Sequence, residues 1–205
     1  FIRVMPDKLQ SFVIKVFECV GTSADDAEFL ADLLVRTDLR GVFSHGTCQL
    51  PGYIEKISDG QVNPCPKVSV VDDSVSTAVV DGDGGLGHFA AHRAACIAVE
   101  KAKTIGLGAA VSRNHFHIGS AGKYSRLALE SECVGFVVSA HRVRHTPESS
   151  ILNASQASPM SFAIPSGREA PIVVDMANSI SSDEPIESLF PRIPATFFKT
   201  LGLGM

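Results

Sequence analysis

Apolar residues recur every three or four positions through the first sixty residues, which predicts amphipathic helices lying on a shared core. The first predicted helix covers about residues 9–20 and ends at Gly21. The second begins after Ser23, where a hydroxyl followed by two aspartates favours a helix N-terminus. Its apolar face leads directly into the segment DLRGVFSHG at residues 38–46.

The pattern changes after residue 60, where short β-branched runs alternate with helical stretches. A connection rich in glycine and proline, DGQVNPCPK at 59–67, marks the change. The spacing predicts helices over 89–103 and 121–130, and it predicts strands at 68–71, 77–80, 107–111, 134–138, 161–164 and 172–174. The predicted class is α/β or α+β, with N-terminal helices followed by a sheet-containing part that also carries helices.

Residues 1–180 form the predicted folded unit, with a helical part at 1–60 and a sheet-containing part at 61–180. Residues 181–205 have three prolines within ten residues and no sustained period, so we predict an irregular tail there. Because the first residue is Phe1 rather than methionine, we expect a fragment or a processed form.

The composition of the chain limits which classes of partner the protein can bind and where in the cell it is expected. With 45% apolar residues, a net charge of −4 and interspersed charges, we expect a globular protein that does not bind nucleic acid. No apolar stretch approaches the length of a membrane helix, so a cytoplasmic protein without membrane contact is expected. The five cysteines are scattered, which predicts reduced, mostly buried thiols, and no ligand spacing indicates a metal.

Residues 82–87, GDGGLG, match the G-x-G-x-x-G pattern of dinucleotide-binding turns, between a predicted strand and a predicted helix. The next strand ends at Ser112-Arg113 without the acidic residue that would bind a ribose. We therefore favour a plain strand-to-helix turn. A classical Rossmann site with Arg113 on a 2′-phosphate stays open as an alternative.

The segment SRNHFHIGSAGKY at 112–124 places two histidines before small residues that open a predicted helix. Backbone N–H groups at such a start could hold a phosphate, and either imidazole could contact a substrate or nicotinamide. We favour His115 over His117 for this role.

His45 lies where the second helix ends, in a setting suited to proton exchange. Ser44 can orient its ring, and the flanking glycine, Gly46, would admit a ligand. Asp175 ends an apolar strand, where an isolated carboxylate is costly unless paired, so an imidazole is its expected partner.

The ordered set DLRGVFSHG, VDGDGGLGH, SRNHF with GSAGKY, SFAIP and VVDMANS resembles the type-2 malate/L-lactate dehydrogenase family of NAD(P)-dependent oxidoreductases. The resemblance implies a non-Rossmann fold, hydride transfer between NAD or NADP and a 2-hydroxy acid such as malate or lactate, and a homodimer. It implies that His45 is the proton donor and acceptor, with Ser44 and Asp175 as its partners. It further implies a substrate-side role for His115 and a cofactor-binding stretch made of Asn114, His115, Phe116, His117 and Ile118.

Some positions depart from the family pattern. Where the family has an arginine that pairs with the substrate carboxylate, this chain has Gln49, and losing a charge-assisted pair costs about 1.5–3 kcal/mol. Two glycine-rich loops are altered at 146–150 and 156–159, and the resemblance covers only the N-terminal part of a full enzyme. A second hypothesis therefore stays open: a truncated or divergent paralogue that keeps the scaffold as a non-catalytic binding protein.

Overall fold

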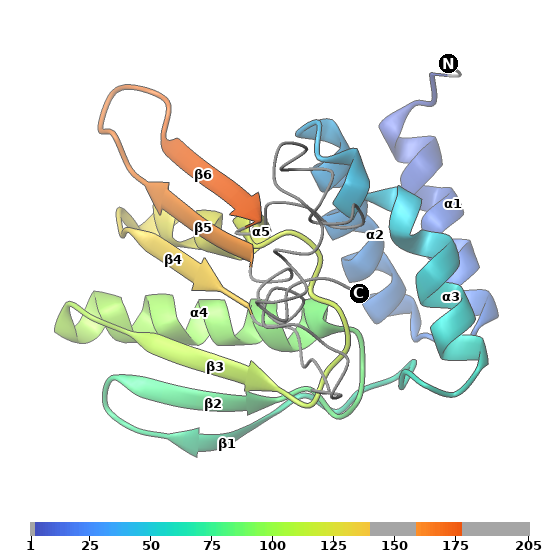
Figure 1. The fold of residues 1–205 in the computed structure, drawn as a ribbon, viewed down its shortest axis with the longest axis horizontal. Helices are drawn as coiled ribbons and strands as arrows, with labels where there is room; N and C mark the ends of the chain where they lie inside the picture. The colour runs from blue at the N-terminus through green and yellow to red at the C-terminus, as the bar shows by residue number, and fades with distance from the viewer. Residues whose placement is uncertain (1–2, 140–158, 178–205) are drawn as a thin grey trace, which may run out of the picture.

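The computed structural model describes residues 3–139 and 159–177 (Figure 1). Three helices gather at one end of the molecule: α1 (Pro6–Cys19), α2 (Ala24–Leu39) and α3 (Leu50–Ser58). They bury one apolar cluster that includes Phe17, Leu34 and Tyr53. The predicted helix start is confirmed, because the Ser23 side chain accepts a hydrogen bond from the Asp26 N–H.

The first sheet has the order β1 (Ser69–Asp73), β2 (Thr77–Asp81), β3 (Ala109–Arg113). Strands β1 and β2 are antiparallel, whereas β2 and β3 are parallel and are joined by α4 (Gly87–Ile105). Helix α4 packs on β2 and β3, and Figure 1 shows it between the two sheets of the molecule.

The second sheet is antiparallel in the order β4 (Gly135–Val138), β5 (Pro159–Ile164), β6 (Ile172–Ala177). Ser161 of β5 is paired with Asp175 of β6. The six predicted strands, the combination of parallel and antiparallel pairing, and the order of helices and sheets are thus confirmed, with shifts of one to three residues at strand ends.

The segment 121–130, predicted as one helix, contains two helices of different type in the structure. One α-helical turn, α5 (Gly122–Ser125), is followed by the 3₁₀ helix η3 (Arg126–Ser131). The chain must then reverse tightly into β4, because Glu132 has a φ of 54° and a Cβ on Gly135 would lie 2.0 Å from the Ser125 carbonyl oxygen.

The expectation of mostly buried cysteines is wrong. Cys19, Cys48 and Cys65 are exposed, Cys96 and Cys133 are half-buried, and all five are free thiols. None of the helices within residues 3–139 and 159–177 is long and apolar enough to cross a membrane. The predicted tail at 181–205, and the altered loops apart from Pro159, lie outside the described residues.

Candidate functional site

The turn that carries His45 is fixed by Asp38 near the end of α2. The Asp38 carboxylate accepts hydrogen bonds from the Thr47 N–H (3.1 Å) and hydroxyl (2.5 Å). A Cβ on Gly46 would lie 1.8 Å from Asp38 Oδ1. Gly46 therefore makes room for this carboxylate, which corrects the expectation that it admits a ligand.

His45 ends the 3₁₀ helix η1 (Phe43–His45), which is followed by a second one, η2 (Thr47–Gln49). The structure places Ser44 Oγ 2.9 Å from His45 Nδ1. Gln49 donates from Nε2 to the Ser44 carbonyl at 2.6 Å, so its amide holds the turn. When Nδ1–H donates to Ser44, Nε2 keeps a lone pair that can accept a proton.

His117, rather than His115, lies beside His45. The two ring centroids are 5.7 Å apart, and Tyr53 Oη is 2.8 Å from His117 Nδ1. Burial raises the pKa of Tyr53, so its hydroxyl stays protonated and we assign it as the donor. The sequence favoured His115 for contact with a substrate or nicotinamide, and it gave no sign of Tyr53, which lies on the apolar face of α3.

A buried pair, Lys123 and His88, contacts the backbone of His45 through the ammonium group of Lys123. Lys123 Nζ donates to the His45 carbonyl (3.4 Å) and to His88 Nε2 (3.2 Å). A Cβ on Gly119 would lie 2.6 Å from Nζ, so this glycine makes room for the ammonium group. Burial lowers the pKa of Lys123 to about 8 and holds the pKa of His88 far below its usual value, which leaves His88 a neutral acceptor.

Asp175 reaches the site from β6, directly over α5. A Cβ on Gly122 would lie 2.5 Å from Asp175 Oδ2, so glycine is needed for this approach. Within the described residues no hydrogen bond joins Asp175 to His45, and Asp175 is exposed. The expected burial and direct pairing with an imidazole are wrong; the carboxylate acts through space, where water can also reach it.

The electrostatics at His45 combine three influences. Partial burial lowers the pKa of the imidazole, the charge of Lys123 lowers it further, and the charge of Asp175 raises it. The ring is thus mostly neutral at physiological pH and gains stabilisation from Asp175 when it takes up a proton. These properties suit a general base that later returns the proton.

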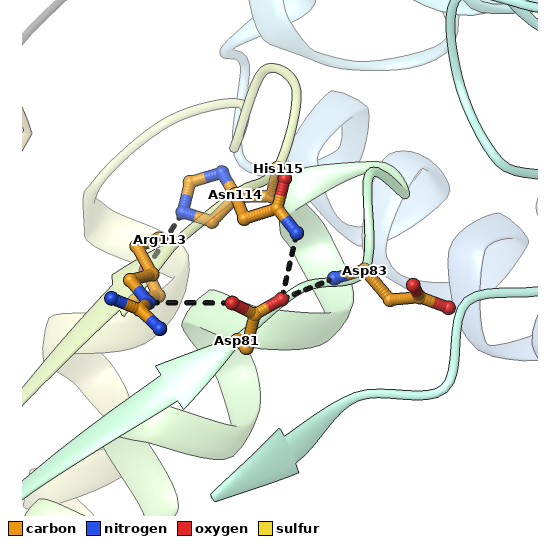
Figure 2. A network of polar contacts seen from close by, with 6 residues as sticks. Asp81, Asp83, Arg113, Asn114 and His115 are labelled. Carbon is orange, nitrogen blue, oxygen red and sulfur yellow. Dashed lines mark hydrogen bonds and ion pairs between the residues drawn. The ribbon is translucent and has the colours of Figure 1, made fainter. Parts of the chain in front are cut away.

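The GDGGLG segment belongs to a separate network, drawn in Figure 2. Asp81 accepts hydrogen bonds from the Asn114 amide (2.8 Å) and the Asp83 N–H (3.0 Å), and it pairs with Arg113 at 3.3 Å. The hydrogen bond from Asn114 is the largest cause of the lowered pKa of Asp81. Arg113 is therefore paired with Asp81, at the position where a classical Rossmann site would use it to bind a 2′-phosphate.

The backbone N–H groups of this segment are also used internally. The Gly84 N–H donates to the Asn114 carbonyl, the Gly85 N–H to the Gly82 carbonyl and the Gly87 N–H to the His117 carbonyl. A Rossmann turn would direct such groups at a pyrophosphate. Together with the antiparallel β1–β2 pair, this makes the classical Rossmann alternative wrong.

His115 has both ring nitrogens occupied by neighbours. Nδ1 donates to the Phe116 carbonyl (2.8 Å), and Nε2 lies 2.9 Å from the Ser112 hydroxyl. Its ring fits against Gly87, where a Cβ would lie 2.7 Å from Nδ1. In the rest of the predicted cofactor stretch, Ile118 is buried, whereas Phe116 is 39% exposed.

The sequence is similar to known dehydrogenases over most of its length. A protein-family model described as malate/L-lactate dehydrogenase matches residues 4–189. Malate dehydrogenase from Pyrococcus horikoshii is 38% identical over 180 residues, which are 88% of this chain and 50% of the relative. L-sulfolactate dehydrogenase from Methanocaldococcus jannaschii is 33% identical over 189 residues, 92% of this chain and 55% of the relative.

The fold is also similar to that of solved dehydrogenase structures. The structure of the Pyrococcus horikoshii malate dehydrogenase aligns with a TM-score of 0.78 at 38% identity, over 88% of this chain and 51% of that one. A malate dehydrogenase from Entamoeba histolytica aligns with a TM-score of 0.78 at 33% identity, over 88% and 50%. The chain thus spans about half the length of these relatives.

Proposed function

The chain belongs to the malate/L-lactate dehydrogenase family, and from this premise we propose that it takes part in hydride transfer between NAD or NADP and a small 2-hydroxy acid. The observation that carries the proposal is the convergence on His45 of a hydroxyl, a carboxylate charge and a second imidazole. Malate, sulfolactate and lactate, after which the relatives are named, all carry a hydroxyl next to a carboxylate.

In this mechanism His45 Nε2 accepts the proton of the substrate hydroxyl as hydride leaves the same carbon, and it returns that proton in the reverse reaction. Ser44 fixes the ring through Nδ1. Asp175 stabilises the imidazolium that forms, as a carboxylate behind a histidine does in other enzymes. The nicotinamide, when bound, supplies the hydride chemistry.

We propose that the predicted cofactor stretch contacts the nicotinamide end of the nucleotide. Phe116 presents an exposed ring and His117 faces His45, so we assign these two residues to the nicotinamide. Asn114 and His115 are engaged in the turn with Asp81 and Ser112, so we assign them the role of holding the stretch in place. Gln49, predicted to contact substrate, is adjacent to this site and holds Ser44.

We further propose that the protein acts as a cytoplasmic homodimer. Exposed apolar side chains at the edge of the helical part support a protein contact there: Met5, Leu39 and Phe43. The net charge of −4 gives no support to nucleic-acid binding.

The test uses the purified protein with NADH and NADPH, followed by nicotinamide fluorescence, and then with oxaloacetate, pyruvate and sulfopyruvate, followed by loss of nicotinamide absorbance. We expect saturable binding of at least one nucleotide and its oxidation by at least one 2-oxo acid. Absence of binding at millimolar nucleotide would contradict the enzyme proposal and favour the non-catalytic paralogue.

A further inference from the structure

Lys123 stands out among the charged side chains because it is only 5% exposed. No other Asp, Glu, Lys or Arg within residues 3–139 and 159–177 is buried. A buried ammonium group is costly unless an opposite charge or several acceptors compensate it. The ion pairs of the described residues all involve other side chains, so no carboxylate there is paired with Lys123.

The contacts of Lys123 are neutral and incomplete. An ammonium group has three N–H donors, and the acceptors given by the described residues are the His45 carbonyl and His88 Nε2. One donor is left for another partner. With a pKa of about 8, the side chain is mainly charged at pH 7.

Asp175 contributes a negative charge from β6, but no ion pair of the described residues joins it to the ammonium group of Lys123. After burial, the charge of Arg40 lowers the pKa of Lys123 further, whereas the charges of Asp38 and Asp175 raise it through space. The two acceptors within hydrogen-bond distance of Nζ are neutral, and one of them is the His45 carbonyl, so the positive charge of the ammonium group lies beside His45. An anion that enters next to His45 would therefore meet the positive charge of Lys123.

We infer that Lys123 binds the carboxylate of the 2-hydroxy or 2-oxo acid, and thereby selects anionic substrates, through its remaining N–H donor. The inference rests on the proposed function for the class of substrate. His88 acts as a positioning residue, since its Nε2 accepts from Lys123 and its buried ring packs edge-on against Tyr53. Gln49 is neutral and donates to the Ser44 carbonyl, so it offers no competing cation.

The test measures binding of oxamate, an isoelectronic analogue of a 2-oxo acid, and of its neutral methyl ester, by calorimetry with and without NADH or NADPH. We compare the wild type with Lys123→Met, which keeps the length of the side chain, and with Lys103→Met, an exposed lysine on α4 that pairs with Glu100. We expect Lys123→Met to weaken oxamate binding at least tenfold, while the ester binds within about twofold of wild type. Lys103→Met should leave both unchanged.

Three results would overturn the inference: no oxamate binding by the wild type, wild-type affinity in Lys123→Met, or equal weakening for oxamate and its ester. Equal weakening would mean that Lys123 only supports the turn of His45. If Lys123→Met does not fold, amine labelling of the wild type at pH 8 decides: oxamate must protect Lys123 and not Lys103. Because binding is measured without turnover, Lys123-dependent binding without reduction of any 2-oxo acid would refute the proposed function and keep this inference.

Discussion

Two segments of the chain look alike in sequence, since each combines glycines with a histidine, yet they differ in how their polar groups are satisfied. In the turn of GDGGLG with Asn114 and His115, backbone and side-chain groups bond to one another (Figure 2). Around His45, a buried cation lacks an ion-pair partner in the described residues, and burial shifts the pKa of both Lys123 and the imidazole. Shifted, incompletely satisfied groups indicate reactivity, whereas satisfied ones indicate structure.

The largest predicted contrast is between the histidines of the two segments. His45→Asn should lower kcat by about 10²–10⁴-fold, because it removes the general base, while nucleotide affinity stays close to wild type. His115→Asn, the matched variant, should change kcat less than about threefold, since both nitrogens of that ring serve the turn. Steady-state kinetics and fluorescence titration give both values. Equal losses of kcat in the two variants would remove the contrast.

The buried charge of Lys123 predicts a pH dependence of stability. In the folded chain its pKa is about 8, against the usual 10.5, so the unfolded chain binds more protons between these values. The free energy of unfolding should therefore rise from pH 8 to pH 10 in the wild type relative to Lys123→Met, by about 2 kcal/mol. Below pH 8 both states are protonated and the cost of burial stays constant. Denaturant unfolding at pH 7, 8, 9 and 10 measures this; parallel curves for the two proteins would show that the charge is not buried.

The smallest predicted effect concerns the turn. Asn114 has a φ of 52°, so Asn114→Ala should cost about 1–2 kcal/mol of stability through backbone strain alone, whereas Asn114→Gly avoids that strain. Both variants remove the amide that lowers the pKa of Asp81, so that pKa should rise toward its usual value. Thermal unfolding and carboxyl NMR separate the two effects. An alanine variant as stable as the glycine variant would argue against a strained turn.

Much of the fold could be predicted from the sequence because it depends on local patterns of apolar and polar residues. The apolar spacing of the first two helices, the β-branched runs of the six strands and the cap at Ser23 each depend on residues a few positions apart. The type of the segment at 121–130 could not be predicted, since it lies next to a long-range contact, the approach of Gly135 to Ser125, that no local pattern shows.

The site was predicted less completely, for a physical reason. Ser44 and His45 are neighbours, so their contact could be anticipated. The burial of Lys123 depends on α4, α5 and η1 meeting, and no local pattern encodes it. Which of the two histidines lies beside His45 depends on the path of the backbone after Asn114, which has a φ of 52°, and not on a local pattern. The glycines at 119 and 122 were visible signals, although their partners, Lys123 and Asp175, were not.

The central claim is that the charges of Lys123 and Asp175 meet at His45, and histidine NMR titration tests it most directly. The pKa of His45 should lie below its usual value in the wild type, rise in Lys123→Met and fall in Asp175→Asn. A pKa of His45 that stays the same in both variants would contradict the account.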